Sequence, residues 1–213
     1  MSKKFTDKQI HILDVAEELI AKKGFKGTSV REISSKANVN VAMISYYFGS
    51  KEKMLAYLYQ YRVQRARANL SEFAQTIIDG KPEMQMKEII KFVVNQMFHY
   101  SYFHGFVRQE FQHDEVIKDD LLEFYHRVTT YIDAIVKKGV ATGVFHYAPK
   151  SEDILVTIIG AALFAIRNEN FYKKYIPDND SETYLQKAQA KVLSSSYQNI
   201  FSLLGYQPEA DPR

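Results

Sequence analysis

The fold of this chain is decided by residues 28–51, TSVREISSKANVNVAMISYYFGSK. Ser29, followed three residues later by Glu32, is typical of a capping box that opens a helix of about nine residues. Residues 38–40, Asn-Val-Asn, predict a tight turn, because asparagine tolerates left-handed dihedral angles and caps helices. A second short helix is then expected over residues 41–47. Two short helices joined by a tight turn are typical of a helix-turn-helix motif.

Helical periodicity continues on both sides of this motif. Before it, apolar residues between Thr6 and Lys23 fall on one stripe, and Gly24 provides a C-terminal stop. After it, Ser50 is expected to cap a long helix from Lys51 to about Ile78. No run of alternating apolar and polar residues occurs, so the sequence predicts an all-α protein. The remaining helices are expected at about 84–102, continuing past Gly105 to 112, and at 115–142, 151–172 and 181–204, the last capped by Ser181 and stopped by Gly205.

Length and composition restrict the class of protein. The chain has 213 residues, of which 46% are hydrophobic and 25% charged, as in a globular protein of one or two domains. It contains no cysteine, which excludes disulfides, thiolate nucleophiles and cysteine-ligated zinc. The start, MSKKFTDKQ, lacks an apolar segment, so we expect no secretory signal and a cytoplasmic location. The apolar run over residues 154–166 is shorter than the about 20 residues of a membrane span, and predicts a helix buried on all sides.

The net charge of +3 is unevenly distributed. Residues 1–67 carry 13 lysines and arginines against 6 acidic residues, whereas residues 68–213 carry 15 against 19. A basic block of this kind indicates a nucleic-acid or anionic-membrane surface, although a solvated basic helix face would look the same. Asp14, Glu17 and Glu18 on the polar face of the first helix suit lipid poorly, so DNA is the favoured partner.

Three segments together carry a family resemblance: ILDVAEELIAKKGF at 12–25, TSVREI at 28–33 and VNVAMISYYFGSKEKML at 39–55. Over about residues 8–56 the chain resembles the DNA-binding domain of the TetR/AcrR family of bacterial transcriptional regulators. The rest of the chain is similar to that family only in helical layout and length. The resemblance implies the following organisation: a helix-turn-helix DNA-binding domain at 1–50, a connecting helix at 51–80, a helical effector-binding and dimerisation domain at 81–205 and a frayed tail at 206–213.

The motif also separates core residues from DNA contacts. Ile33, Val39, Ile44 and Phe48 have the spacing of inner faces, so we expect them in the core. Short hydroxyls and helix N-termini suit phosphate oxygens. The predicted DNA-binding residues are Thr28, Ser29, Arg31, Asn40, Val41, Ala42, Met43, Ser45, Tyr46, Tyr47 and Lys51.

Several of these residues have a more specific predicted role. Lys51 opposes the dipole of the helix it starts, which a bound phosphate would explain, and the resemblance assigns Lys51 and Tyr47 to backbone contacts. Arg31 either reaches a guanine or pairs with a surface carboxylate. Many family members carry an aromatic residue at the position of Ser45, so the operator sequence is not transferable. Val41, Ala42 and Met43 offer apolar contacts to thymine methyl groups.

The C-terminal part carries two further predictions. Aromatic residues and histidines are dense between residues 98 and 111, which is typical of an ordinary core but also of an apolar ligand pocket with polar groups. The resemblance implies an effector pocket there, for an apolar or aromatic small molecule. It also implies a homodimer formed by the helix around 154–166 and the last helix, with burial inside one chain as the alternative. The predicted pocket residues are Phe98, Tyr100, Tyr102, Phe103, His104, Phe106 and Phe111.

An enzyme remains the alternative from another class. Glu110-x-x-His113 and Glu123-x-x-His126 match the motif of di-iron helical bundles, but they begin only 13 residues apart and lack the two further glutamates. We therefore expect no metal, no cofactor, no catalytic residue and no membrane partner. The sequence predicts a transcriptional regulator, a repressor released from a palindromic double-stranded DNA operator by a small-molecule effector. It identifies neither effector, operator nor regulated genes.

Overall fold

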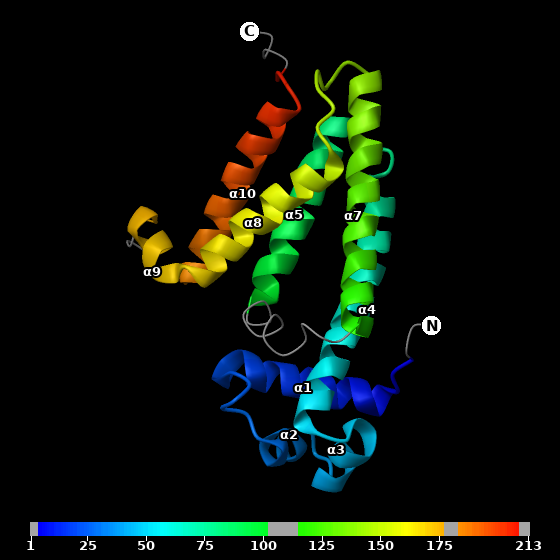
Figure 1. The fold of residues 1–213 in the computed structure, drawn as a ribbon, viewed down its shortest axis with the longest axis vertical. Coiled ribbons are helices and arrows are strands. Elements are labelled where there is room, and N and C mark those ends of the chain that lie inside the picture. Colours follow the sequence, from blue (N-terminus) through cyan, green and yellow to red (C-terminus); the bar gives the residue numbers. More distant parts are fainter. Residues whose placement is uncertain (1–3, 102–114, 177–182, 209–213) are drawn as a thin grey trace. The chain divides into compact units, whose positions relative to one another are not determined.

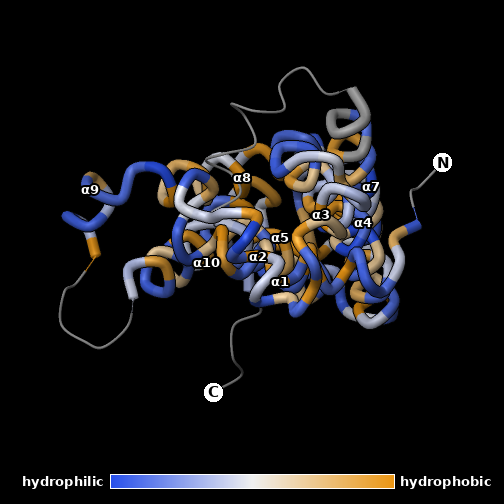
Figure 2. Tube along the Cα trace, turned by 90° about the horizontal axis from the view of Figure 1, so that it is seen from below, coloured by the Kyte–Doolittle hydropathy of each residue, from blue (hydrophilic) through white to orange (hydrophobic). Residues whose placement is uncertain are grey.

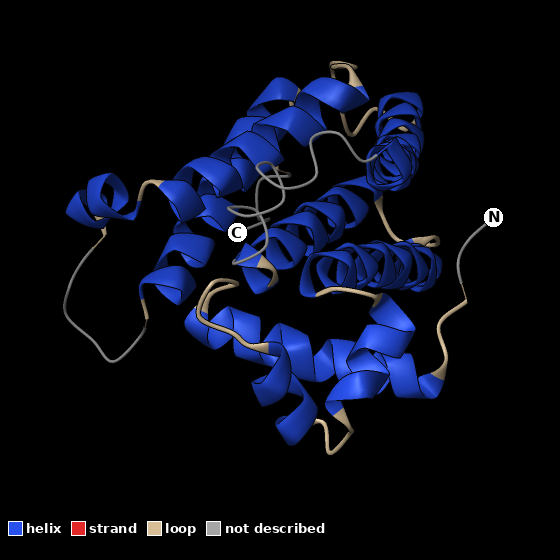
Figure 3. Cartoon of the chain, turned by 60° about the horizontal axis from the view of Figure 1, so that its bottom comes forward, coloured by secondary structure: helices blue, strands red, loops and turns tan. Residues whose placement is uncertain are grey.

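The computed structural model describes residues 4–101, 115–176 and 183–208. Within these ranges every regular element is a helix, as Figure 3 shows, which confirms the all-α prediction. The chain divides into two compact units, each described by itself below. The N-terminal unit comprises Met1–Asn69 with Gly105–Phe124, and the C-terminal unit comprises Leu70–His104 with Tyr125–Arg213. The first boundary lies inside the predicted connecting helix.

The N-terminal unit contains α1 (Asp7–Lys23), α2 (Val30–Lys36), α3 (Val41–Phe48) and the first part of α4 (Lys51–Ile77), labelled in Figure 1. Ile33, Ile44 and Phe48 are at most 2% exposed, which confirms their predicted core positions. Val39 is only half-buried, since it belongs to the turn before α3.

Local side-chain caps fix the ends of these helices. Asn38 has a φ of 51°, so the predicted left-handed turn residue is confirmed. Asn40 caps α3 by accepting a bond from the Ala42 amide at 2.9 Å. Ser50 Oγ likewise accepts from the Lys53 amide at 3.1 Å, at the start of α4. Because each bond joins residues close in sequence, the sequence was sufficient to predict them.

In the C-terminal unit α5 (Pro82–His99), α8 (Ser151–Arg167) and α10 (Tyr184–Leu203) pack on one another. Ile90, Ile158 and Val192, one from each helix, have no exposed surface. Figure 2 shows orange, hydrophobic segments of the chain where α5 and α8 lie. The unit also contains residues 125–141 of α7 (Glu115–Ala141).

Three expectations for this unit were wrong. The helix expected at 151–172 ends at Arg167, and α9 (Glu169–Tyr172) and the 3-10 helix η1 (Lys173–Tyr175) follow after a bend of 92°. The last helix is capped by Thr183, which shares a reciprocal capping box with Gln186, whereas Ser181 lies outside the described residues. Residues 154–166 are not buried on all sides, because Val156 is 68% and Phe164 48% exposed.

The predicted frayed tail is wrong at its first residue. The Tyr206 amide donates to the Phe201 carbonyl at 3.0 Å. The Tyr206 ring lies 5.0 Å from that of Phe201 and 6.3 Å from that of Phe145, between ring centroids. Long-range aromatic packing of this kind leaves no pattern in the sequence.

No single helix among the described residues is long and apolar enough to cross a membrane. Only α8 taken together with residues 169–175 meets the length and composition criteria, as a bent pair.

Candidate nucleic-acid interface

Helix α3 presents one face to the core and the opposite face to solvent. Ile44 and Phe48 are buried, whereas Val41 is 41% and Tyr46 83% exposed. Asn40, Ala42 and Ser45 are also exposed, and Met43 and Tyr47 are half-buried. A core on one side and short or planar side chains on the other is the arrangement that a recognition helix requires. The structure therefore brings the predicted α3 residues together on one surface.

Arg31 lies on α2 and is exposed. None of the residues that the structure describes forms an ion pair with it, and the adjacent Glu32 pairs with Lys23 instead. The surface-pair alternative for Arg31 has no support here, and its five N–H donors are available to an external acceptor.

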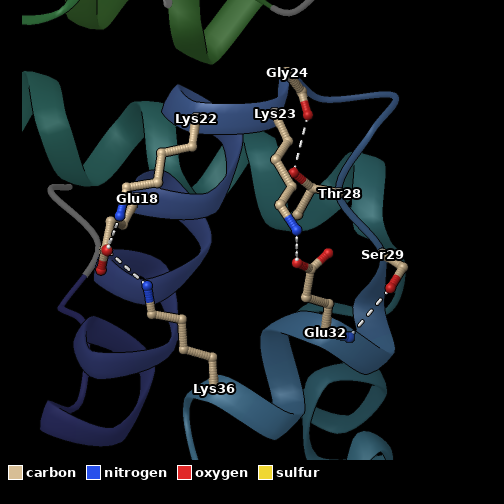
Figure 4. Close-up of polar contacts among 8 residues, drawn as sticks. All are labelled: Glu18, Lys22, Lys23, Gly24, Thr28, Ser29, Glu32 and Lys36. Carbon is tan, nitrogen blue, oxygen red and sulfur yellow. Dashed lines mark hydrogen bonds and ion pairs between the residues drawn. The ribbon is translucent and has the colours of Figure 1, made fainter.

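Thr28 differs from the other predicted contacts, because its side chain is directed into the protein. It is 1% exposed, and its hydroxyl donates to the Gly24 carbonyl oxygen at 2.9 Å. The side chain thus ties the loop before α2 to the end of α1 (Figure 4). The structure gives Thr28 a structural role and does not favour the predicted phosphate contact of this hydroxyl.

Lys51 is half-buried and contacts Phe25 in two ways. Its Nζ donates to the Phe25 carbonyl oxygen at 2.6 Å and lies 4.1 Å from the centroid of the Phe25 ring. The carbonyl dipole and the ring face both attract a cation, which explains a lysine at the start of α4 without any ligand. An ammonium has three donors, so a phosphate oxygen can still be bound. Sequence reasoning missed Phe25, which is 26 residues away.

Ion pairs between helices hold the motif in shape (Figure 4). Glu18 on α1 binds Lys22 at 2.8 Å and Lys36 of α2 at 2.6 Å. The predicted capping box at Ser29 is only half formed. The hydroxyl accepts from the Glu32 amide at 3.2 Å, but the Glu32 carboxylate pairs with Lys23 at the end of α1. These contacts tie α2 to α1 from both of its ends.

Lowering the pH is expected to break the Glu18 bridges only under strongly acidic conditions. Hydrogen bonds from Lys22 and Lys36 lower the pKa of Glu18 from 4.5 to about 2. A lowered folded-state pKa stabilises the fold fully above the unfolded value of 4.5, and this contribution is lost as the pH falls through about 2. An NMR titration of the Glu18 carboxyl carbon should therefore show a midpoint near 2. Lys22→Met and Lys36→Met should each raise that midpoint, and an unchanged midpoint in both variants would contradict the assignment.

Arg62 on α4 is a second residue that sequence reasoning missed. Its guanidinium binds Asp14 at 2.9 Å and also Glu17, both on α1. The side chains of Arg62 and Glu17 are only 12% and 13% exposed. Arg67, five residues further along α4, binds Glu123 of α7 at 2.8 Å. Within the N-terminal unit, α4 is thus bound ionically to α1 and to the first part of α7.

The predicted effector residues are described only in part. Phe98 is 5% exposed and Tyr100 is half-buried. Tyr102, Phe103, His104, Phe106 and Phe111 lie outside the described residues.

The metal-binding alternative gains no support. No group of three or more histidine and acidic side chains that could hold a metal ion occurs in the described ranges. Glu123 binds Arg67 and His126 is exposed, whereas Glu110 and His113 lie outside those ranges.

Comparison with known proteins decides the family. Residues 12–58 match bacterial regulatory proteins of the tetR family, and residues 82–194, more than half of the chain, match the tetracyclin repressor-like C-terminal domain. The chain belongs to the TetR family. It is 30% identical over 129 residues to the probable HTH-type transcriptional regulator YttP of Bacillus subtilis (strain 168), covering 60% of this chain and 62% of YttP. The match thus spans just under two thirds of that relative.

Two further relatives agree. The HTH-type transcriptional repressor NicS of Pseudomonas putida is 27% identical over 150 residues, covering 69% of this chain and 68% of NicS. A TetR/AcrR regulator from Thermobifida fusca YX-ER1 has the same fold, with a TM-score of 0.67 and 19% identity over 90% of this chain and 97% of that protein. At the level of the family, the prediction of a DNA-binding transcriptional regulator is confirmed, and the di-iron enzyme finds no support among these relatives.

Proposed function

We propose that this TetR-family chain is a homodimeric repressor that binds a pseudo-palindromic DNA operator and is released by a small-molecule effector. The observation that carries the proposal is the solvent face of α3, where Asn40, Ser45 and Tyr46 are exposed above a buried core. A bacterial operator lies in the cytoplasm, so the protein acts there.

The proposed contacts divide into two kinds. Arg31 and the solvent face of α3 lie toward base edges, with Val41, Ala42 and Met43 against thymine methyl groups. Ser29, Tyr47 and Lys51 contact phosphates and set the register. Thr28 contributes through the loop that it holds rather than through its hydroxyl.

The proposed response uses α4, a continuous helix that runs from the N-terminal unit into the C-terminal unit. The two DNA-binding domains of a dimer, called the heads below, must lie about 34–36 Å apart to read successive major grooves. An effector that binds better to a dimer with another separation therefore weakens DNA binding. The proposed effector is an apolar or aromatic small molecule that binds among the aromatic residues 98–111.

Selection from a random-sequence duplex library tests this function. We expect enrichment of one pseudo-palindromic site whose half-sites are about 10 base pairs apart or a multiple of that. Sedimentation of the free protein at micromolar concentration should show a dimer. Enrichment of a site without two-fold symmetry, or a monomer that DNA leaves unchanged, would overturn the homodimeric part of the proposal.

Lys51→Ala is expected to weaken binding to the selected site and to random DNA alike. One ionic phosphate contact is lost, so the slope of log K against log salt should fall by about 0.9 per head. Tyr47→Phe is the matched control, because it removes a neutral hydroxyl and should leave the slope unchanged. Thermal unfolding of both variants separates DNA binding from loss of the Phe25 contact. If Lys51→Ala binds DNA as tightly as the parent at physiological salt, the phosphate assignment is wrong.

A further inference from the structure

Two helices, α4 and α7, run from the N-terminal unit into the C-terminal unit. The boundary between the units falls after Asn69 in α4 and after Phe124 in α7. The response proposed for the effector involves α4. Contacts on both sides of the boundary indicate that α7 takes part as well.

The first contact between α4 and α7 lies in the N-terminal unit. Arg67 of α4 binds the carboxylate of Glu123 of α7 at 2.8 Å. The Arg67 side chain is only 13% exposed, so water screens this ion pair less than a pair on the open surface. The Arg67–Glu123 pair is called the N-terminal tie below.

The second contact lies in the C-terminal unit, where α4 ends. The last turn of α4, residues 74–77, contains no basic residue, although the carbonyl groups at a helix C-terminus attract a cation. Lys138 of α7 supplies one. Its Nζ donates to the Gly80 carbonyl oxygen at 2.9 Å and lies 3.5 Å from that of Ile78, which directly follows α4. This contact of Lys138 is called the C-terminal tie below.

Gln85 of α5 holds the same end of α4. It is 6% exposed, in a helix whose other buried residues are apolar. Its Nε2 donates to the carbonyl oxygens of Ile77 at 2.6 Å and Ile78 at 2.8 Å, so both N–H groups of the amide are used. The end of α4 is therefore held by side chains of α5 and α7.

The two ties have similar separations on both helices. At 1.5 Å per residue, Arg67 lies about 17 Å from Ile78 along α4, and Glu123 lies about 23 Å from Lys138 along α7. The long side chains of arginine and lysine can cover the difference. Both helices begin in the N-terminal unit and end in the C-terminal unit, so a shift of one helix along the other strains both ties. The ties stay intact only if the two helices move together.

We propose that α4 and α7 act as one two-helix connection, joined at both ties, that holds the DNA-binding domain in the orientation its operator requires. The proposal rests on the proposed function and adds α7 and the positioning residues Gln85, Glu123 and Lys138 to it. Opening either tie releases the connection, because a single remaining tie lets the helices slide and rotate. The two ties therefore depend on each other, whereas residues this far apart usually act independently.

Two substitutions on the surface of α7 open the ties one at a time. Glu123→Ala removes the N-terminal tie, and Lys138→Met removes the C-terminal tie. Asp119→Ala and Lys137→Met are the matched controls, because both residues are exposed on α7 and each substitution makes the same change of charge while leaving the ties in place.

Binding is measured to the selected operator and to the same operator with one base pair inserted between its half-sites. The insertion rotates one half-site by about 35° and moves it by about 3.4 Å, so the ratio of the two dissociation constants reports how firmly the heads are oriented. Each tie variant should lower this ratio about 5-fold, and the double variant should lower it about 5-fold as well rather than about 25-fold. Both controls should keep the parent ratio. Loss of stability alone would weaken binding to both operators equally.

The outcomes separate this inference from the proposed function. Effects that multiply in the double variant, or a parent-like ratio in both single variants, would overturn the two-helix connection and leave the repressor standing.

Hydrogen exchange of the free protein tests the connection without DNA. Glu123→Ala should speed exchange of the amides of residues 75–77, at the far tie, and Lys138→Met should speed exchange of those of residues 64–67, each about 3-fold. Changes confined to the turn around each substitution would overturn the inference, whether or not the protein selects a symmetric operator.

Discussion

Replacing Gly139 with alanine should lower the free energy of unfolding by about 2–4 kcal/mol. The sign is opposite to the usual one, since alanine normally stabilises the interior of a helix by about 1 kcal/mol relative to glycine. The reason is the ring of Phe145, which covers the backbone of α7 at this position. A Cβ atom on Gly139 would lie 2.0 Å from Phe145 Cδ2 and 2.4 Å from Cε2.

Phe145 has little freedom to relieve this clash. Phe145 is 2% exposed. Its backbone amide donates to the Gly139 carbonyl at 3.1 Å, which holds the backbone of Phe145, and with it the base of its side chain, close to Gly139. Its ring also contacts those of Phe201 and Tyr206, with centroids 6.4 and 6.3 Å away. Relief of the clash therefore disturbs the packing of α10 as well.

Urea unfolding of Gly139→Ala measures the effect, and a cycle with Phe145→Leu identifies its cause. Phe145→Leu alone destabilises by loss of buried surface. In that background Gly139→Ala should cost at least 1 kcal/mol less than in the parent, about the size expected for a direct contact. Equal costs in both backgrounds, or a stabilised Gly139→Ala protein, would contradict the contact.

Arg62→Met is the second change with a large expected effect, a loss of about 2–4 kcal/mol in the free energy of unfolding. The substitution keeps an apolar stem but removes the guanidinium that binds Asp14 and Glu17. Because Glu17 is 13% exposed, its carboxylate then loses a charged partner in a largely buried place. The expected loss of unfolding free energy is at the low end of the range for buried ion pairs, because Asp14 is 44% exposed and partly solvated.

Lys137→Met on α7 is the matched control. Lys137 binds Asp133 at 2.7 Å, but the two side chains are 75% and 49% exposed, so about 0.5 kcal/mol or less should be lost. Adding Glu17→Gln to Arg62→Met should recover part of the stability, because no buried charge is then left. DNA affinity should fall with Arg62→Met, since the pair holds α4 to the helix that supports the motif. If Arg62→Met lowers the free energy of unfolding as little as Lys137→Met does, the ion pairs of Arg62 with Asp14 and Glu17 do not stabilise the fold.

Local sequence was enough to predict part of the fold and of the interface. The α3 cap at Asn40, the left-handed Asn38 and the core positions Ile33, Ile44 and Phe48 follow from spacings of a few residues. The same spacing predicted the solvent face of α3. Thr28 shows the limit of prediction from local sequence. A threonine hydroxyl suits a phosphate, but the direction of this hydroxyl is set by the loop, where it donates to the Gly24 carbonyl.

The end of the helix expected at 151–172 shows a second limit. The apolar pattern continues beyond Arg167, so periodicity alone extends the helix, whereas the chain bends at Asn168. Likewise, the run over 154–166 is apolar on every side, so its pattern cannot distinguish the face on α5 and α10 from the face that carries Val156. Which side is covered depends on the neighbouring helices.

By itself, the sequence determined an all-α chain with a helix-turn-helix near its N-terminus, because caps, turns and helical periods depend on residues within about one turn of each other. Its membership of the TetR family followed from the resemblance of whole segments to known family members. Only the tertiary structure decided that Lys51 binds Phe25, that Arg62 binds Asp14 and Glu17, and that Gly139 lies under the Phe145 ring. A residue's type and period indicate whether it is buried or charged. Its partner is set by how helices pack, which brings together positions whose separation in the chain carries no pattern.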